Sequence, residues 1–244
     1  DPGVAIGVAP SPYTIDDDGS GLSNGNGDLI ANGGETLEIF VSAKNYGSED
    51  ATNVIGYMSS TSGNVSIDTT ANMVEFGDIA SGETSNGSVP FVVVLNDGLH
   101  DGADLDLLVT FLDSDGGSFD GILDISVHGN QLSAIDVDVL GSASDVLTPG
   151  ESSFVKIELN NTGSTHAVSV SGTITCASPF IEILDDNGTW VSINSGESSF
   201  NGNDYFELSA LDVTIPGAIA HLIVSLETEE GYTSNSIIEV QIGE

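Results

Sequence analysis

Apolar and β-branched residues occur in this chain as short runs, separated at regular intervals by clusters of glycine, asparagine, aspartate and serine. Many runs alternate between apolar and polar residues, which is typical of β-strands with one buried face, and no segment has the period of an amphipathic helix. The pattern therefore predicts an all-β protein. The expected strands are Val4–Val8, Tyr13–Ile15, Thr36–Lys44, Ala51–Ser59, Val65–Asp68, Met73–Asp78, Ser85–Leu95, Leu105–Ser114 and Ser118–His128, then Ser133–Leu140, Ser152–Asn160, Val168–Cys176, Ile181–Leu184, Tyr205–Thr214, Ala220–Thr228 and Asn235–Ile242.

The same succession of strands and turns occurs twice. Gly34-Glu35 and the apolar strand after it are matched by Gly150-Glu151 and a second apolar strand. The turn that follows, Asn45-Tyr46-Gly47, is matched by Asn161-Thr162-Gly163. Self-similarity over a domain-sized distance indicates a tandem array of one module. Such arrays usually serve reach or display rather than catalysis.

Each copy has roughly seven short strands with turn residues between them, as in a Greek-key β-sandwich of the immunoglobulin type. We therefore expect two tandem immunoglobulin-like Greek-key β-sandwiches, residues 1–129 and residues 130–244. The first copy begins with an extended apolar segment and an acidic loop. Only His128-Gly129-Asn130-Gln131 lies between the copies, which is too short for a flexible tether.

The charge of the chain is extreme. It has 38 acidic residues against two basic ones, Lys44 and Lys156, for a net charge of -36. Nucleic acid is excluded as a ligand, because phosphate binding needs clustered lysine and arginine, and anionic membrane surfaces are excluded for the same reason. No apolar stretch is long enough for insertion into a membrane. A divalent metal, high salt or a basic partner is expected to offset the self-repulsion.

One acidic loop has the spacing of a calcium-binding loop. Its oxygen donors stand at positions 1, 3, 5, 7, 9 and 12 of an EF-hand loop, the seventh being a backbone carbonyl. These positions correspond to Asn24, Asn26, Asp28, Ile30, Asn32 and Glu35, and an aspartate from the preceding Asp16–Asp18 run, Asp16 or Asp18, could complete the set. The cofactor that we expect is Ca²⁺. Two features depart from the EF-hand: Leu29 replaces the glycine at position 6, and no helices flank the loop.

The alternative for this loop is that its asparagine, aspartate and glycine residues only form turns. The second copy provides an internal control, because its corresponding segment, Leu140–Glu151, lacks most of these donors and is expected to bind no metal. A further acidic loop, Asn96–Asp104, is a weaker candidate. The histidines, His100, His128, His166 and His221, lack the spacing of metal ligands.

Asn32-Gly33-Gly34-Glu35-Thr36, an apolar strand, and then Asn45-Tyr46-Gly47 follow one another in an order that resembles immunoglobulin-like repeats of secreted bacterial and archaeal surface proteins. The adhesion-related repeats beside extracellular proteases and in surface-layer or adhesin chains are similar. The likeness extends to the second copy through Pro149-Gly150-Glu151 and Asn161-Thr162-Gly163. It implies a sandwich fold and an extracellular or cell-surface location, but not a particular activity. Any secretion signal is expected to be already removed, since Asp1-Pro2-Gly3 does not begin one.

No motif of a nucleophilic, metal-dependent or nucleotide-dependent enzyme occurs in the sequence, so a non-enzymatic role is expected. The first hypothesis is a subunit of a surface filament, pilus-like fibre or adhesin stalk. It would polymerise with itself through the leading strand, in which Val4, Ile6 and Val8 would face a neighbouring subunit. The second hypothesis is an accessory or spacer module of a secreted hydrolase.

A third hypothesis is a carbohydrate-binding module. Trp190 could stack on a sugar, together with four of the tyrosines, Tyr46, Tyr57, Tyr205 and Tyr232. The alternative for Trp190 is packing in the core or at a sheet edge. Sequons for attached glycans occur at Asn64, Asn86, Asn160 and Asn187.

Overall fold

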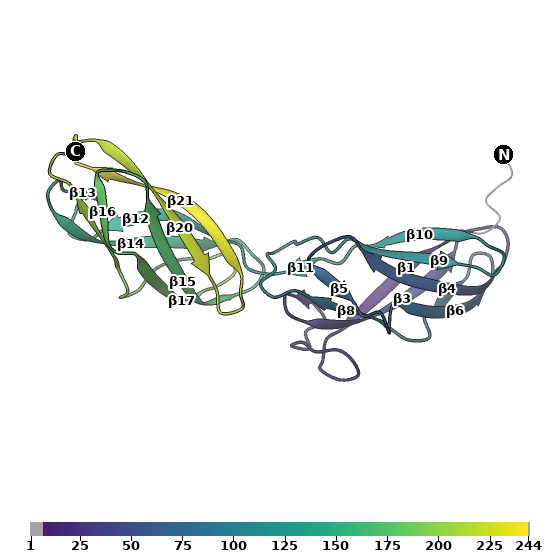
Figure 1. Cartoon of the computed structure of the whole chain (residues 1–244). Helices are drawn as coiled ribbons and strands as arrows, with labels where there is room; N and C mark the ends of the chain where they lie inside the picture. Colours follow the sequence, from purple (N-terminus) through teal and green to yellow (C-terminus); the bar gives the residue numbers. More distant parts are fainter. Residues whose placement is uncertain (1–6, 244) are drawn as a thin grey trace. The chain divides into compact units, whose positions relative to one another are not determined.

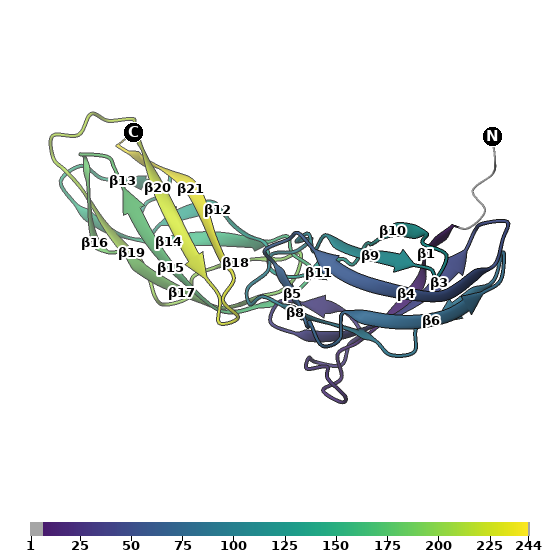
Figure 2. The ribbon, with the colours of Figure 1, turned by 45° about the vertical axis from the view of Figure 1, so that its right-hand side comes forward.

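The structure is a computed structural model that describes residues 7–243 (Figures 1 and 2). The chain is all-β, with 57% of residues in strands and no helix in the described part. It divides into two compact units, Asp1–His128 and Gly129–Glu244. Each unit contains several sheets around its own hydrophobic core, an arrangement compatible with a β-sandwich.

The first unit has two main sheets. One sheet has the order β1 (Val8–Asp16), β3 (Thr36–Asn45), β8 (Phe91–Leu95) and β5 (Val65–Ile67), with β7 (Thr84–Asn86) also paired to β3. The other has the order β10 (Ser118–Leu123), β9 (Leu107–Leu112), β4 (Ala51–Ser60) and β6 (Met73–Ile79). A short parallel pair, β2 (Ala31–Asn32) with β11 (Val127–His128), lies beside the acidic loop.

The second unit also has two sheets. One has the order β12 (Leu132–Val139), β14 (Ser152–Asn161), β19 (Phe206–Ala210) and β16 (Ile181–Asp185), with β18 (Ser198–Phe200) also paired to β14. The other has the order β13 (Val146–Leu147), β21 (Thr233–Ile242), β20 (Ala218–Glu227), β15 (Ala167–Cys176) and β17 (Asn187–Ile193).

Period-two alternation explains how each strand contributes to its core. In β9, Leu107, Val109 and Phe111 are fully buried and the residues between them are more exposed. Phe111 packs edge-on against Phe76 of β6, with ring centroids 5.3 Å apart. In the second unit Trp190 of β17 is buried against Phe206, and its indole N–H donates to the Ile157 carbonyl.

A fully buried asparagine occupies the end of the same strand in each unit. Asn45 ends β3: its Oδ1 accepts hydrogen bonds from the amides of Gly7 and Gly47, and its Nδ2 donates to the carbonyls of Glu49 and Ile79.

Asn161 ends β14 and makes the corresponding contacts. Its Oδ1 accepts from the amides of Gln131 and Gly163, and its Nδ2 donates to the carbonyls of Thr165 and Ile193. Each asparagine therefore joins a strand end, the turn after it and a strand of the other sheet.

The strands differ from the sequence-based expectation at several places. β1 is one continuous strand with a bulge between Ser11 and Tyr13, because β3 pairs along its whole length. The expected strand Ser85–Leu95 is split into β7 and β8, because its pairing with β3 stops after Asn86 and resumes at Phe91, and Pro90 between them lacks an amide for the ladder. β17 was not expected as a strand, since Asn187-Gly188 has the sequence of a turn.

The leading apolar segment was expected to contact a neighbouring subunit. Val4 and Ile6 lie outside the described residues, so their position is untested. Val8 is 3% exposed in the core of its own unit and is paired with Asn45 of β3. The described part of this segment therefore has its partner within the same chain.

The asparagine network is expected to be a main contributor to the stability of each unit. Asn161→Ala should lower the free energy of unfolding of the second unit by about 3 kcal/mol or more, because buried backbone groups lose their partners. Urea unfolding followed by the fluorescence of Trp190, the single tryptophan, measures this unit. The exposed Asn203 is the matched control, and Asn203→Ala should change stability by less than about 0.5 kcal/mol. A loss below about 1 kcal/mol for Asn161→Ala would contradict the assignment.

Candidate cation-binding loop

The acidic loop connects β1 to β3 in the first unit. It leaves β1 after Asp16, and the backbone of Asn24 pairs with Thr36 at the start of β3, with N to O distances of 2.8 and 2.9 Å. Both ends of the loop are therefore fixed to the same sheet.

Asp17 is the first residue after β1 and is fully buried. Its two carboxylate oxygens accept hydrogen bonds from the amides of Gly27 and Leu29, at 2.9 Å each. Gly25 lies directly beside it, where an added Cβ would stand 2.8 Å from both the Asp17 Cβ and a Glu35 carboxylate oxygen. A side chain at position 25 would force these two acidic groups apart.

Glu35 is the second buried carboxylate. Its Oε1 accepts from the Asn26 amide at 3.2 Å and its Oε2 from the Asn32 amide at 2.9 Å. Burial raises the pKa of Glu35 above its usual value, the two amide hydrogen bonds oppose this, and the nearby charges of Asp17 and Asp28 raise the pKa further. No described cation offsets these charges, because Lys44 lies over the Tyr46 ring and Lys156 is paired with Asp138.

The remaining predicted ligands form a chain of short turns. Asn26 Oδ1 accepts from the Asp28 amide, and Asp28 Oδ1 accepts from the Ile30 amide, both at 2.9 Å. The side chains of Asn26 and Asn32 are in contact at 3.3 Å. Asn26, Asp28, Asn32 and Glu35 are thus brought together.

Asp16 and Asp18 lie where the chain leaves β1 and enters the loop. Asp16 Oδ1 accepts from the Asp18 amide and Asp18 Oδ1 accepts from the Ser20 amide, so both side chains hold turns of their own backbone. Hydrogen bonds from Ser20 lower the pKa of Asp18. The aspartate that reaches into the loop is Asp17, which alternation alone could not identify among three adjacent aspartates.

Leu29, which departs from the EF-hand pattern, adopts the backbone conformation that favours glycine. Its φ is +66° and its side chain is 63% exposed. The chain therefore makes the sharp turn of position 6 without glycine, at the cost of strain in a non-glycine residue.

The donor set suits a hard cation that binds oxygen. Within residues 7–243, no three His, Cys, Asp or Glu side chains form a cluster able to hold a metal. A cation here would depend on Glu35 and Asp28 together with amide and backbone oxygens. Ca²⁺ accepts such a mixed set, whereas Zn²⁺ prefers nitrogen and sulfur.

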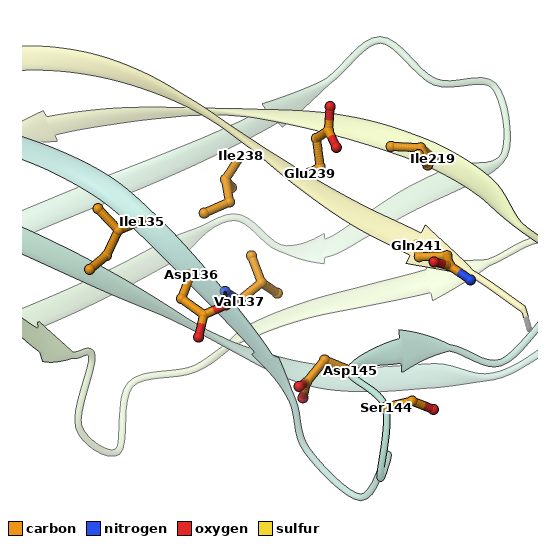
Figure 3. Close-up of a pocket in the computed structure, with 9 residues that line it drawn as sticks. All are labelled: Ile135, Asp136, Val137, Ser144, Asp145, Ile219, Ile238, Glu239 and Gln241. Carbon is orange, nitrogen blue, oxygen red and sulfur yellow. Dashed lines mark hydrogen bonds between the residues drawn. The ribbon is translucent and has the colours of Figure 1, made fainter.

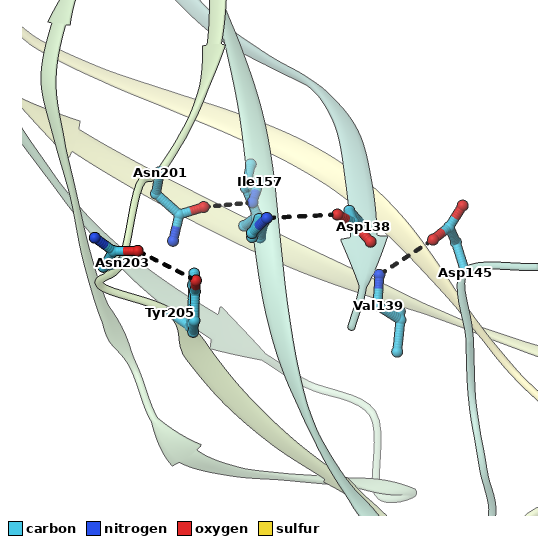
Figure 4. Close-up of polar contacts among 8 residues, drawn as sticks. Asp138, Val139, Asp145, Ile157, Asn201, Asn203 and Tyr205 are labelled. Carbon is cyan, nitrogen blue, oxygen red and sulfur yellow. Dashed lines mark hydrogen bonds and ion pairs between the residues drawn. The ribbon is translucent and has the colours of Figure 1, made fainter. Parts of the chain in front are cut away.

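Two further loops hold structural contacts: Asn96–Asp104, the weaker metal candidate, and Leu140–Glu151, which is expected to bind no metal. In the Asn96–Asp104 loop, the Asn96 carbonyl accepts from the Gly34 amide and its side chain donates to Gly63. In the second unit, Asp145 Oδ1 accepts from the Val139 amide at 3.3 Å (Figure 4).

An open groove of about 390 Å³ lies beside β12 in the second unit (Figure 3). Ile135 and Ile219 line it together with three carboxylates, those of Asp136, Asp145 and Glu239. The groove lacks aromatic side chains and cationic side chains, so its chemistry favours neither sugar stacking nor anion binding.

The aromatic residues proposed for sugar binding do not form a platform. Trp190 is 1% exposed and Tyr232 is 6% exposed, so both are core residues. Tyr205 packs on Phe154 and Tyr57 is 37% exposed on the first unit. Tyr46 is exposed beside Lys44.

The sequons occupy turns and strand ends. Asn86 and Asn187 are exposed, at the end of β7 and the start of β17. Asn64 donates to the Asp104 carbonyl, and Asn160 is half-buried in β14.

Comparisons with known proteins leave the family open. No protein-family model matches the chain, and no curated protein is significantly similar to it. A crystal structure of red sea bream transglutaminase matches 99% of this chain and 32% of its own length, with 12% identity and a TM-score of 0.38. A crystal structure of a protein of unknown function from Porphyromonas gingivalis W83 matches 95% of this chain and 100% of its own length, with 11% identity and a TM-score of 0.26. These likenesses are too distant to bear on function.

No helix long and apolar enough to cross a membrane occurs among residues 7–243.

Glu35 is expected to make the metal-free first unit less stable as the pH rises. Its pKa is raised on folding, so its contribution is fully present below the ordinary glutamate pKa of 4.5 and is lost as the pH passes the raised folded-state pKa. Calorimetric unfolding in chelator should show this loss, and it should be smaller in Glu35→Gln. Glu83→Gln, at an exposed site of the same unit, should keep the parental pH dependence. An unchanged pH dependence in Glu35→Gln would show that Glu35 is not the group responsible.

Proposed function

We propose that this chain is a non-enzymatic extracellular structural protein, composed of two immunoglobulin-like Greek-key sandwiches and stabilised by calcium. It would serve as a subunit of a surface filament, a pilus-like fibre or an adhesin stalk. The observation that carries the proposal is the repeated asparagine network of Asn45 and Asn161, which fixes equivalent strand ends in both units. Repetition of one rigid module is a device for extension and display.

Calcium binding is proposed at the acidic loop of the first unit. Asp17 and Glu35 are buried carboxylates that lie close together, and Asp28 adds a third negative charge beside them. Like charges in a buried site repel strongly unless a cation accompanies them. The spacing of oxygen donors and the turn at Leu29 suit Ca²⁺.

Calcium should stabilise the first unit by mass action. At a concentration about a hundredfold above the dissociation constant, the gain in unfolding free energy is roughly 3 kcal/mol. Calorimetry should show the first unit's transition rising with Ca²⁺ and falling with chelator, while Trp190 fluorescence reports an unchanged second unit.

Two variants make this test specific. Glu35→Ala should lose the calcium effect, whereas Asp145→Asn, in the corresponding loop of the second unit, should keep it. Unfolding that is indifferent to both calcium and chelator would refute the calcium site.

Assembly through the leading segment is proposed only for the residues that precede β1, because Val8 is buried in its own unit. Deleting residues 1–6 should leave both units folded and abolish long assemblies seen by electron microscopy. Deleting residues 1–12 should in addition destabilise the first unit, since it removes Val8 and much of β1. Assemblies of normal length after the shorter deletion would exclude this segment as the polymer contact.

The second candidate is a spacer module of a secreted hydrolase. It is favoured by the absence, in the described residues, of any catalytic arrangement around the histidines: His166 contacts Asn194, and His221 contacts Glu239 on the surface. A monomer that forms no assembly with or without calcium would favour this role.

A further inference from the structure

One glutamate of the first unit breaks the alternation of its strand. In β3, Leu37 and Ile39 face the core, so Glu38 between them lies on the outward face of the sheet. Phe40, the next residue on that face, is 42% exposed, whereas Glu38 is only 9% exposed. A glutamate is rarely buried to this extent without a partner. Another part of the chain must therefore cover Glu38.

The cover is the acidic loop. An added Cβ at Gly21 would stand 2.6 Å and 3.0 Å from the two carboxylate oxygens of Glu38, so the loop backbone lies directly against this carboxylate. The second unit has a shorter loop at this place, 140–151, and carries Phe154 at the position of Glu38 in the repeat. Phe154 is 50% exposed. The longer loop and the buried glutamate therefore occur together.

The neighbours of Glu38 in the sheet leave its charge uncompensated. β1 places Asp16 directly opposite Glu38, and β8 places Val92, which is 2% exposed, on the other side. Among residues 7–243, the Glu38 carboxylate accepts no hydrogen bond and forms no ion pair. Like charges directly opposite in paired strands are destabilising, and burial of a carboxylate without a partner is costly. A cation between Glu38 and Asp16 would remove both costs.

We propose that Glu38 and Asp16 bind a second hard divalent cation, with the properties of Ca²⁺, where the loop at Gly21 covers the outward face of β1 and β3. Only Oδ1 of Asp16 accepts a hydrogen bond in the described residues, from the Asp18 amide, so its Oδ2 remains available. Ca²⁺ binds through carboxylates supplemented by backbone carbonyls and water. The inference takes the identity of the ion from the calcium binding proposed above and adds a site to it.

This Glu38 site lies in a different part of the loop from the site of Asp17 and Glu35. Those two carboxylates accept hydrogen bonds from amides of residues 26–32, in the second half of the loop. Glu38 instead contacts Gly21, in the first half. Both oxygens of Glu38 keep their full acceptor capacity, which a cation can use.

Isothermal titration of the whole chain with CaCl₂ tests the inference. About 0.5 M NaCl is included, because it screens the diffuse attraction of Ca²⁺ to so acidic a surface. The parent should bind two Ca²⁺ ions per chain. Glu38→Gln should weaken one of the two sites by about tenfold or more, since it removes a charged ligand. Glu35→Ala should retain the Glu38 site, and Glu75→Gln, at an exposed position of the same unit, should bind like the parent.

Calorimetry distinguishes a cation ligand from a residue that only packs under the loop. In chelator, Glu38→Gln should not lower the Tm of the first unit, because it removes a charge that faces Asp16. The gain in Tm on adding Ca²⁺ should be smaller in Glu38→Gln than in the parent. A glutamate that only packs would give the same change in Tm under both conditions.

The outcomes separate this inference from the proposed function. One Ca²⁺ ion per chain that is lost in Glu35→Ala and kept in Glu38→Gln would overturn the Glu38 site and leave the proposed loop site intact. A single ion lost in both variants would also overturn the inference, because Glu35 and Glu38 would then share one site. Equal losses in Glu38→Gln and Glu75→Gln would overturn it, since the effect would not be local.

Two further outcomes are decisive. A lower Tm of Glu38→Gln in chelator would show that the carboxylate has a partner within the protein, and would overturn the Glu38 site. A parent that binds no Ca²⁺ would overturn both the Glu38 site and the proposed calcium loop.

Discussion

The buried amide of Asn45, repeated as Asn161, is the interaction on which each unit depends. At these positions a strand of one sheet ends, the chain turns sharply, and a strand of the other sheet passes close by. The backbone groups around that turn are shielded from water and need hydrogen-bond partners within the protein. One asparagine side chain supplies both the donors and the acceptors. A neutral amide does this without a buried charge, which matters because the chain has almost no cations to pair with one. The tight turn after Asn161 also requires glycine at position 163, because an added Cβ would stand 2.3 Å from the Gly129 carbonyl oxygen.

Much of the fold follows from the sequence, because alternation and turn residues agree along the long strands. Thr36–Lys44 was expected as a strand and β3 spans Thr36–Asn45. The expectation from the sequence was wrong where the same residues can form either a turn or a strand. Asn187-Gly188 suggested a turn, yet these residues begin β17, because Gly188 packs under the Phe206 ring with no room for a Cβ. Expectation and structure also diverge at Ser85–Leu95, where local apolar character hid the break at Gly87 and Pro90.

The acidic loop was predictable in its composition but not in its geometry. Spacing indicated that Asn26, Asn32 and Glu35 would meet, and in the structure they do. Spacing could not indicate that Asp17 is buried while Asp18 is exposed. That choice depends on the register of β1 against β3, which pairs Asp16 with Glu38 and turns the next residue inward. Register is a tertiary property, set by long-range pairing and the bulge at Ser11.

The two units share a framework but differ in where negative charge is concentrated. In the first unit the carboxylates of Asp17 and Glu35 are buried in one loop, and the edge strand β6 contains Glu75 and Asp78. In the second unit the equivalent loop has lost most acidic donors, and the edge strand β17 contains no charge. Negative charge is therefore distributed differently over the two units, and the proposed cation site belongs to the unit whose loop gathers buried carboxylates.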